Sequence, residues 1–240
     1  MNSVRLYYIE IEPGNDTLSI SRELFDLWLQ ELSAQKRSAI QRLVHGRDQL
    51  TSMLGLRLLK QCAIDEGFSD FKLTEVIYPE REKPQWAPQC TVRQGLDENR
   101  VFDFNISHTH GLVVVAISKT LKLGIDAEQI RPLKRLSFKM VMREDELAQI
   151  KKTPGQFFDL WSKKEAVVKA ANTAGLSRMR DVILDDAAGD KTALLDDHLW
   201  YVKSMSEEMN LSLGYAIHLA TSLPADKVVL RSVLIDDLKH

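Results

Sequence analysis

Hydrophobic and polar positions alternate near the start of the chain with the period of two that a half-buried β-strand requires. Residues 4–11 show this alternation, and residues 21–32 then place leucine and tryptophan side chains at the spacing of one helix face. Apolar positions at helical spacing continue through residues 34–66, where His45 and Gly46 predict a break. We therefore expect one strand followed by helices.

The middle of the chain predicts further strands. Residues 71–78 resemble a strand, whereas residues 79–100 are rich in proline and polar side chains and are expected to form a loop. Residues 101–105 begin a strand that leads to a turn before the apolar run 112–118. Residues 121–127 follow after a two-residue link, so these last two strands are expected to pair as a hairpin.

The second half of the chain repeats this order of elements. Helices are expected over residues 136–142, 144–151 and 157–171, and short strands over residues 182–184, 199–202, 211–220 and 228–235. Because helices followed by strands occur twice, the pattern indicates an α+β protein of two similar halves, residues 1–118 and 119–240. A ligand is expected in the cleft between them.

Composition narrows the functional class. Hydrophobic residues make up 44% and charged residues 28% of the chain, as in ordinary globular proteins. The net charge of −2 provides no general field that recruits nucleic acid. The apolar run at residues 111–117 is too short to cross a membrane, and acidic and basic residues interrupt the first 13 positions. With two cysteines only, we expect a cytoplasmic protein without a disulfide framework.

Asp126 and Glu128 lie two positions apart at the end of an expected strand, so their side chains point to one face. Two carboxylates on a buried face repel each other unless a cation lies between them. A hard divalent cation such as Mg²⁺ takes oxygen ligands of this kind. The alternative is an edge strand with a solvated acidic face, which is the commoner situation.

Glu165 offers a third carboxylate from a different element. It lies in an apolar and aromatic helix, four residues before Lys169, so the two side chains share a face. A solvated surface pair is equally compatible with this spacing, because Lys163 and Lys164 lie on the same helix. The helix alone therefore leaves both interpretations open.

Residues 105–108, Asn-Ile-Ser-His, end a strand and enter a turn. A hydroxyl, an imidazole and free backbone N–H groups there are suited to holding phosphate, and capping of the turn is the alternative. Ser107 and His108 are not expected to act as nucleophile and base, because adjacent strand residues point to opposite faces. Arg81, Lys83 and Pro84 add a basic loop before this strand.

These strings occur in the order typical of one enzyme family. They comprise Lys83-Pro84, residues 104–109, residues 124–128 with Glu146, and residues 161–169. Over residues 37–175 the chain resembles the Sfp-type 4′-phosphopantetheinyl transferases. The resemblance implies two α+β halves related by a pseudo-twofold axis, an active site in the cleft between them, and a metal site on the second half.

The resemblance also implies a role for each matching position. Asp126, Glu128 and Glu165 hold Mg²⁺, which also binds the pyrophosphate of coenzyme A. Lys169 contacts that pyrophosphate and is a catalytic residue that stabilises or protonates the leaving group. Glu146 matches the acid proposed as the base in relatives, acting directly or through water. Further contacts to coenzyme A are expected from six residues: Arg37, Arg81, Lys83, Pro84, Ser107 and His108. Of these, Arg37 matches the family pattern only loosely.

The implied activity is that of a holo-[acyl-carrier-protein] synthase. A monomer would move 4′-phosphopantetheine from coenzyme A to a serine hydroxyl of an acyl or peptidyl carrier protein and release adenosine 3′,5′-bisphosphate. A small acidic carrier is expected to dock on the basic amphipathic segment 136–142, although an ordinary amphipathic helix is an equal interpretation.

Two positions depart from the family pattern. Thr109 replaces a serine and keeps the hydroxyl. Leu50 and Thr51 stand where several relatives carry the His and Arg that help to hold the 3′-phosphate, so Arg47 or Arg57 is expected to compensate.

Two other functions compete with the transferase. A metal-dependent nuclease would share Asp126 and Glu128, but no lysine follows two residues later and the basic residues form no track. A coenzyme A- or carrier-binding module without turnover would not need to keep three acids together with Lys169. Metal-dependent turnover separates such a module from the enzyme.

Overall fold

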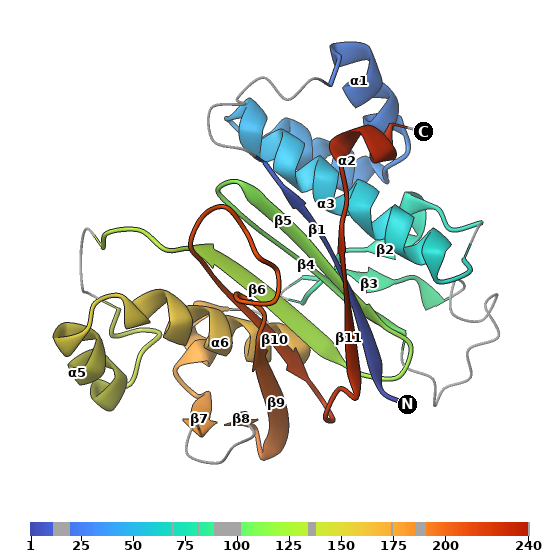
Figure 1. Ribbon diagram of the computed structural model, residues 1–240. Coiled ribbons are helices and arrows are strands. Elements are labelled where there is room, and N and C mark those ends of the chain that lie inside the picture. The colour runs from blue at the N-terminus through green and yellow to red at the C-terminus, as the bar shows by residue number, and fades with distance from the viewer. Residues whose placement is uncertain are drawn as a thin grey trace.

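The computed structural model describes residues 1–11, 20–68, 70–80, 82–88, 102–133, 138–173, 175–185 and 191–239. Two larger β-sheets face each other, and helices cover the outer face of each (Figure 1). The α+β class expected from the sequence is confirmed.

The first sheet has the strand order β11-β1-β5-β4. Its members are β1 (Ser3–Glu10), β4 (Asp103–Thr109), β5 (Leu112–Ser118) and β11 (Lys227–Ser232). Strand β11 runs parallel to β1, whereas the other pairs are antiparallel. The C-terminal strand therefore joins a sheet made otherwise by the first half of the chain, and a division after residue 118 stays a prediction.

Three helices cover the outer face of this sheet: α1 (Arg22–Gln30), α2 (Ala34–Gln41) and α3 (Gly46–Asp65). The side chains of Ser21 and Ser33 accept backbone N–H groups and start the first two helices. The break expected at Gly46 is confirmed, because α3 begins there. No helix in the described ranges combines the length and the hydropathy of a membrane span.

The strand expected over residues 71–78 is mostly wrong. Residues Leu73–Glu75 form a 3₁₀ turn, η1, and only β2 (Val76–Ile77) is extended, paired with β3 (Gln85–Trp86). The carboxylate of Glu75 accepts the N–H of Lys72 at 3.2 Å and closes the turn. Such a local side-chain contact leaves no trace in the apolar pattern.

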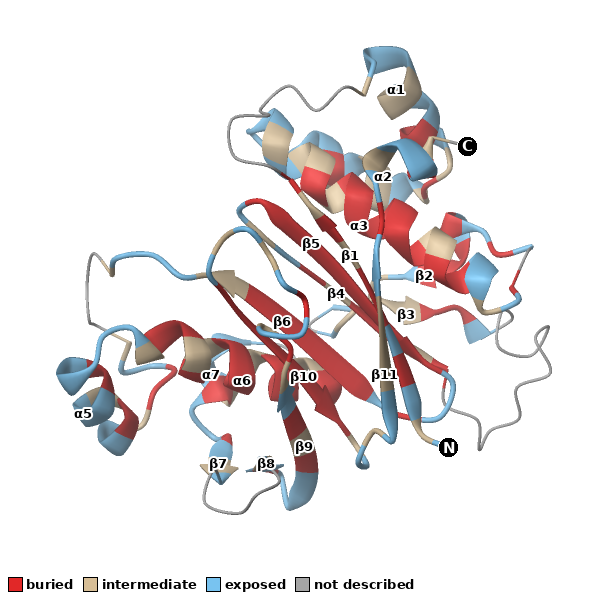
Figure 2. Cartoon of the chain, viewed as in Figure 1, coloured by how far each residue is buried: buried red, intermediate tan, exposed pale blue. Residues whose placement is uncertain are grey.

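The second sheet has the order β6-β10-β9-β8-β7 and is antiparallel throughout. Its strands are β6 (Leu123–Gln129), β7 (Ile183–Asp185), β8 (Thr192–Leu195), β9 (His198–Ser204) and β10 (Tyr215–Thr221). Strand β8 was not predicted. Strands β5 and β10 are buried along their whole length, as Figure 2 shows, because each lies between the partner sheet and a helical layer.

The remaining helices are α5 (Glu144–Lys152), α6 (Gln156–Ala170), α7 (Leu176–Met179) and the 3₁₀ turn η2 (Ile235–Leu238). The helix expected over residues 136–142 is not formed by its described part, residues 138–142, which make a single turn. Glu146 accepts the N–H of Arg143 at 2.7 Å and starts α5 instead. Residues 134–137 lie outside the described ranges.

The hairpin expected between the strands at 112–118 and 121–127 is also wrong. Strand β5 pairs with β1 and β4, and β6 pairs with β10 in the other sheet. The second edge of β6 is occupied by side chains of β4, which replace a backbone partner. Four of them accept successive alternate N–H groups of β6, at distances of 2.8 to 3.2 Å: Asp103 from Leu123, Asn105 from Ile125, Ser107 from Ala127 and Thr109 from Gln129.

This side-chain ladder explains the alternating polar residues of β4. The four residues are spaced two apart along β4, so their side chains lie on the same side of the strand and all point toward β6. The ladder fixes the register between the two sheets, and β6 carries the acidic pair into the site described next.

Candidate active site

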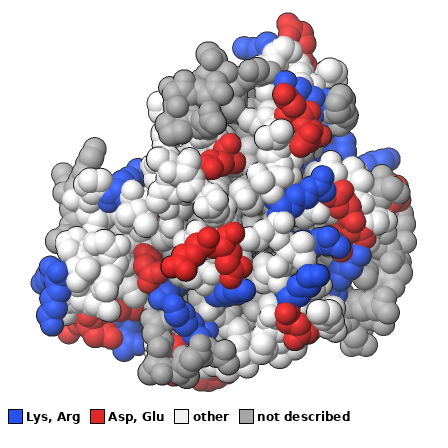
Figure 3. All heavy atoms as spheres, viewed as in Figure 1, with Lys and Arg blue, Asp and Glu red and all other residues white. Residues whose placement is uncertain are grey.

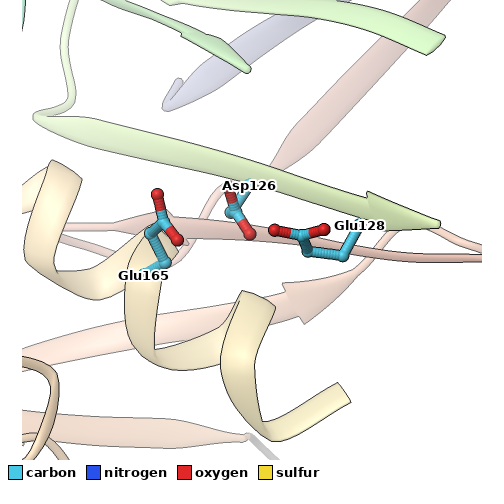
Figure 4. Close-up of side chains that lie close together, drawn as sticks. All are labelled: Asp126, Glu128 and Glu165. Carbon is cyan, nitrogen blue, oxygen red and sulfur yellow. The ribbon is translucent and has the colours of Figure 1, made fainter. Parts of the chain in front are cut away.

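Three carboxylates meet where α6 crosses β6. Asp126 and Glu128 extend from the same face of the strand, and Glu165 reaches them from the helix (Figure 4). One oxygen of each lies within 4.8 Å of the others. The structure therefore brings together the three acids that the sequence suggested, from two separate elements.

The helix comes this close because position 124 is glycine. A Cβ atom at Gly124 would lie 2.1 Å from the backbone oxygen of Ala166 and 2.4 Å from the backbone nitrogen of Ala170. Only a residue without a side chain leaves room for the helix backbone at this point. The glycine at the head of the Gly-Ile-Asp-Ala-Glu string thus sets the distance between the acids of β6 and those of α6.

Lys169 is the counter-charge of the cluster. Its Nζ atom donates to Asp126 Oδ1 at 2.6 Å and lies 3.2 Å from Glu165 Oε1. Asp126 is 2% exposed and also accepts the hydroxyl of Ser107 at 3.0 Å. Its other oxygen, Oδ2, is buried without a hydrogen-bond partner. A buried carboxylate oxygen in this state calls for a cation or a further donor.

Glu165 is held by its own helix. The indole N–H of Trp161, one turn earlier, donates to Glu165 Oε2 at 2.8 Å. This contact and the Lys169 pair fix the carboxylate, so little reorganisation is needed to bring it onto a ligand.

The electrostatics of the cluster favour an added positive charge. Burial first, then the charges of Asp126 and Glu165, raise the pKa of Glu128 to about 7. Burial likewise raises the pKa of Asp126. Burial alone would lower the pKa of Lys169, but the two carboxylates beside it raise it. Among the described residues, Lys169 is the one ammonium paired with these three carboxylates, so the cluster is short of positive charge whenever the acids are ionised.

A pocket of about 330 Å³ opens beside the cluster, between β4, the loop before it and α6. Four of the residues expected to contact the ligand line it: Lys83, Pro84, Glu165 and Lys169. Its remaining walls are mainly apolar and include Ile106.

Lys83 lies deeper than the sequence suggested. Its side chain is 7% exposed, and Nζ donates at 2.6 Å to both Asp103 Oδ2 and the carbonyl of Leu123. Burial lowers the pKa of this ammonium, and Asp103 opposes that effect. Lys83 therefore joins the lining loop to the seam between the two sheets.

His108 is exposed and turned away from the carboxylates, while its neighbour Ser107 is buried against Asp126. The pKa of His108 is lowered by desolvation of the ring and then by the charges of Lys169 and Lys36. Lys36 lies over the ring of Tyr78, 5.0 Å from its centroid. The sequence analysis named Arg37 and missed its neighbour Lys36. Adjacent helix positions face different sides, so only one of the two can point toward His108.

Arg37 is engaged elsewhere. Its guanidinium donates to the carbonyls of Leu29, Gln30 and Leu32 at 3.0, 3.2 and 3.3 Å, which satisfies the C-terminal end of α1. A role for Arg37 at the ligand stays a prediction. Arg81 lies outside the described residues.

The departures at positions 50 and 51 have structural uses. Leu50 packs against the first core, and the buried hydroxyl of Thr51 donates to the carbonyl of Arg47 at 3.1 Å. Arg57 is also buried: it pairs with Glu31 at 2.7 Å, donates to the carbonyl of Leu238 and stacks on Trp28. This guanidinium therefore holds the C-terminal turn onto α3.

Glu146 lies outside the carboxylate cluster. Its Oε2 atom accepts the ammonium of Lys164 at 2.6 Å as well as the N–H of Arg143. Lys164 is 0% exposed, so the pair is a buried tether between α5 and α6. Its role as a base stays a prediction.

A second pocket, of about 660 Å³, adjoins the other side of the cluster and was not expected from the sequence. Glu128 and Arg131 lie at its polar end. Its apolar walls are formed by Leu133, Phe138, Phe157, Phe158 and Trp161. Trp161 thus contacts both this pocket and Glu165. On the face of the molecule seen in Figure 3, acidic and basic side chains lie beside one another.

Comparison with known proteins places this geometry in a family. Residues 122–216 match the model of the 4′-phosphopantetheinyl transferase superfamily. Residues 19–120 match the model of the N-terminal part of a 4′-phosphopantetheinyl transferase. The first match contains the whole carboxylate cluster with Lys169, and the second contains the side-chain ladder of β4.

Characterised relatives carry the same description. The chain is 26% identical to 4′-phosphopantetheinyl transferase psf-1 of Bacillus pumilus over 230 residues, 92% of this chain and 91% of the relative. It is 33% identical over 123 residues to HetI of a Nostoc species, covering 48% of this chain and 51% of HetI. It is 26% identical over 156 residues to gsp of Aneurinibacillus migulanus, covering 63% of this chain and 60% of gsp. The chain therefore belongs to the 4′-phosphopantetheinyl transferase superfamily.

Proposed function

We propose that this transferase moves 4′-phosphopantetheine from coenzyme A to a serine hydroxyl of an acyl or peptidyl carrier protein, in a reaction that requires Mg²⁺. The observation that carries the proposal is the buried cluster of Asp126, Glu128 and Glu165 beside a pocket lined by Lys83 and Lys169. In its specific form, the proposal is that the enzyme is a holo-[acyl-carrier-protein] synthase, that it acts in the cytoplasm and that it is a monomer.

The donor set fits Mg²⁺. All three ligands are carboxylate oxygens, which hard cations prefer, and Oδ2 of Asp126 is without a partner. A divalent cation would relieve the repulsion among the three carboxylates, which Lys169 compensates only in part. When bound, Mg²⁺ supplies charge compensation for the pyrophosphate of coenzyme A.

The side chains around the cluster account for the rest of the transfer. The serine hydroxyl gives its proton to a base, the role that the resemblance assigns to Glu146 directly or through water, while its oxygen attacks the β-phosphorus. The bond from that phosphorus to the bridging oxygen breaks, and adenosine 3′,5′-bisphosphate leaves. Lys169 offsets charge on the pyrophosphate oxygens. Burial alone would lower the pKa of Lys169, but Asp126 and Glu165 raise it in the metal-free protein, which favours the charged ammonium for this role.

The nucleotide portion of coenzyme A would occupy the 330 Å³ pocket. Pro84 and Ile106 offer apolar contact there, and Lys169 lines the same pocket. Desolvation and then the charges of Lys169 and Lys36 lower the pKa of His108, so both ammonium groups lie near this ring. We propose Lys36 as a phosphate contact in the position that the sequence assigned to Arg37.

The carrier would approach from the second pocket. Its aromatic walls reach Glu128 and Trp161, so a helix seated there could present a serine to the cluster. Mapping which residues the apo carrier protects from hydrogen exchange tests this placement: protection confined to other surfaces contradicts it.

The direct test is the intact mass of an apo acyl carrier protein after incubation with the enzyme, coenzyme A and Mg²⁺. We expect a gain equal to one phosphopantetheine group, and no gain when EDTA is present. Binding of coenzyme A without a mass gain on several unrelated carriers would instead support a binding module without turnover.

Without metal, the protein is expected to lose stability as the pH rises toward neutrality. The pKa of Glu128 is raised from its ordinary 4.5 to about 7, so the folded state holds this proton more tightly than the unfolded state. The stabilisation is full below about pH 4.5 and is lost as the pH rises through 7. Because the group is partly exposed, we expect an effect on the order of 1 kcal/mol.

Urea unfolding in EDTA at pH 5 and pH 7.5 measures this effect. Glu128→Gln should remove the loss, whereas Glu207→Gln, at an exposed position, should keep it. Saturating Mg²⁺ should suppress the loss in the wild type. An equal pH response of wild type and Glu128→Gln contradicts the prediction.

Glu146→Gln is expected to lower the free energy of unfolding by about 1–3 kcal/mol, because it removes the counter-charge of buried Lys164. Exposed Glu144, on the same helix, supplies the control Glu144→Gln. The kcat of the folded variant tests the base: a fall of roughly 10²-fold or more supports that role, and a value near wild type contradicts it.

A further inference from the structure

A polar cluster that the proposed chemistry does not use lies between α6 and β10, and it is buried except at Asp159, whose side chain is 47% exposed. The imidazole of His218, 1% exposed, places Nδ1 2.7 Å from the hydroxyl of Ser162, which is 0% exposed. On its other side, His218 Nε2 lies 3.3 Å from Asp159 Oδ1. Lys163 pairs with the same aspartate at 2.9 Å. Burying such groups is unfavourable unless their contacts are specific.

This cluster is adjacent to the carboxylates. In the antiparallel pairing of β10 with β6, His218 is the direct partner of Asp126. Directly opposed residues of an antiparallel pair point to the same face, so both side chains face α6. Ser162 precedes Glu165 on that helix by three residues, about one turn. His218 therefore contacts α6 beside the acid of β6 and one turn before the acid of the helix.

The chemistry of the ring matches its two neighbours. Burial lowers the pKa of His218, so the imidazole is neutral and has one donor and one acceptor. Burial alone would raise the pKa of Asp159, but His218 and Lys163 hold it well below its usual range. An ionised carboxylate only accepts, so Asp159 at 3.3 Å favours the tautomer with the proton on Nε2, although this contact lacks hydrogen-bond geometry. In that tautomer Nδ1 accepts from the Ser162 hydroxyl at 2.7 Å. In the other tautomer, with the proton on Nδ1, the lone pair of Nε2 would face the carboxylate of Asp159.

Apart from the hydrogen bond of Lys169 to Asp126, many contacts between α6 and the sheet are made by small residues, which offer little resistance to sliding or rotation. On the strands they are made by Gly124, Ala216 and Ala220, and on the helix by Ala166 and Ala170. Small side chains offer a smooth surface with few interlocking shapes. The hydrogen bond between His218 and Ser162, with Asp159 3.3 Å from the other ring nitrogen, adds a directional contact that these alanines and the glycine do not supply.

We propose that His218, acting with Ser162 and Asp159, is a positioning residue of the metal site. It fixes the rotation and axial position of α6 on β6 and β10, and so the spacing between Glu165 and the pair Asp126 and Glu128. This inference rests on the proposed function in that it takes the carboxylate cluster to be a divalent-cation site.

The test is the affinity of the purified, folded protein for Mn²⁺, measured by electron paramagnetic resonance without substrates. His218→Leu keeps apolar volume but removes both polar contacts, and should raise the Mn²⁺ dissociation constant by roughly 10-fold or more. Ser162→Ala should weaken binding in the same direction. His218→Gln, whose amide can accept from Ser162 and donate to Asp159, should recover most of the affinity.

A purely structural role predicts a different result. Leu195→Ala in β8 removes buried side-chain volume from the second core without touching the cluster, and it should lower stability while leaving Mn²⁺ affinity unchanged. If His218→Leu and Ser162→Ala are destabilised but bind Mn²⁺ as the wild type does, the positioning role is wrong. If the wild type itself binds no Mn²⁺, the metal site of the proposed function is wrong, and this inference with it.

Discussion

Asp126→Asn is expected to reduce the rate of phosphopantetheine transfer by roughly 10²–10³-fold while the protein stays folded. The substitution keeps the size of the side chain and an oxygen that can accept from Lys169 or Ser107. It removes one of three carboxylates that would hold Mg²⁺, together with the charge that holds Lys169 in place. Intact mass of the carrier against time, at saturating Mg²⁺, gives the rate.

Folding is expected to survive because the apo site contains more negative than positive charge. Loss of one carboxylate leaves Lys169 paired with Glu165 and relieves the repulsion that raises the pKa of Glu128. The matched control is Asp145→Asn, at an exposed position on α5, which should transfer at the wild-type rate. If Asp126→Asn transfers phosphopantetheine at the wild-type rate, Asp126 is not a ligand of the metal.

Gly124→Ala is expected to cost about 3 kcal/mol of stability and, in the molecules that remain folded, about 10²-fold in transfer rate. The added methyl group would lie 2.1 Å and 2.4 Å from backbone atoms of α6, which cannot turn aside as a flexible side chain can. The helix must move away from β6. Because α6 carries Glu165 and Lys169, this displacement separates them from Asp126 and Glu128.

Thermal or urea unfolding gives the stability, and transfer below the unfolding transition gives the rate. Gly155→Ala is the control, because nothing lies within 4 Å of a Cβ atom at that position, so its stability should be unchanged or slightly higher. If Gly124→Ala is as stable and as active as Gly155→Ala, the close packing of α6 on β6 does not set the geometry of the site.

The sequence by itself predicted several of the local elements and, through the family resemblance, the three acids that the structure brings together. Regular periodicity predicted β1, the two helices on either side of Gly46 and the long helix α6, because each buries one continuous apolar face. The two-residue spacing of Asp126 and Glu128 placed both on one face of a strand. Order and spacing of the motifs then indicated the family, which the comparisons confirm.

Only the tertiary structure decided how these elements meet. Short linkers favoured a β5–β6 hairpin, but four polar side chains of β4 occupy the edge of β6 and send the two strands to different sheets. Single-residue patterns also could not reveal that Arg37 caps α1, that Glu146 pairs with Lys164, or that His218 lies beside Asp126. Periodicity records which face of an element is apolar, whereas a polar side chain's partner depends on long-range packing that brings distant residues together.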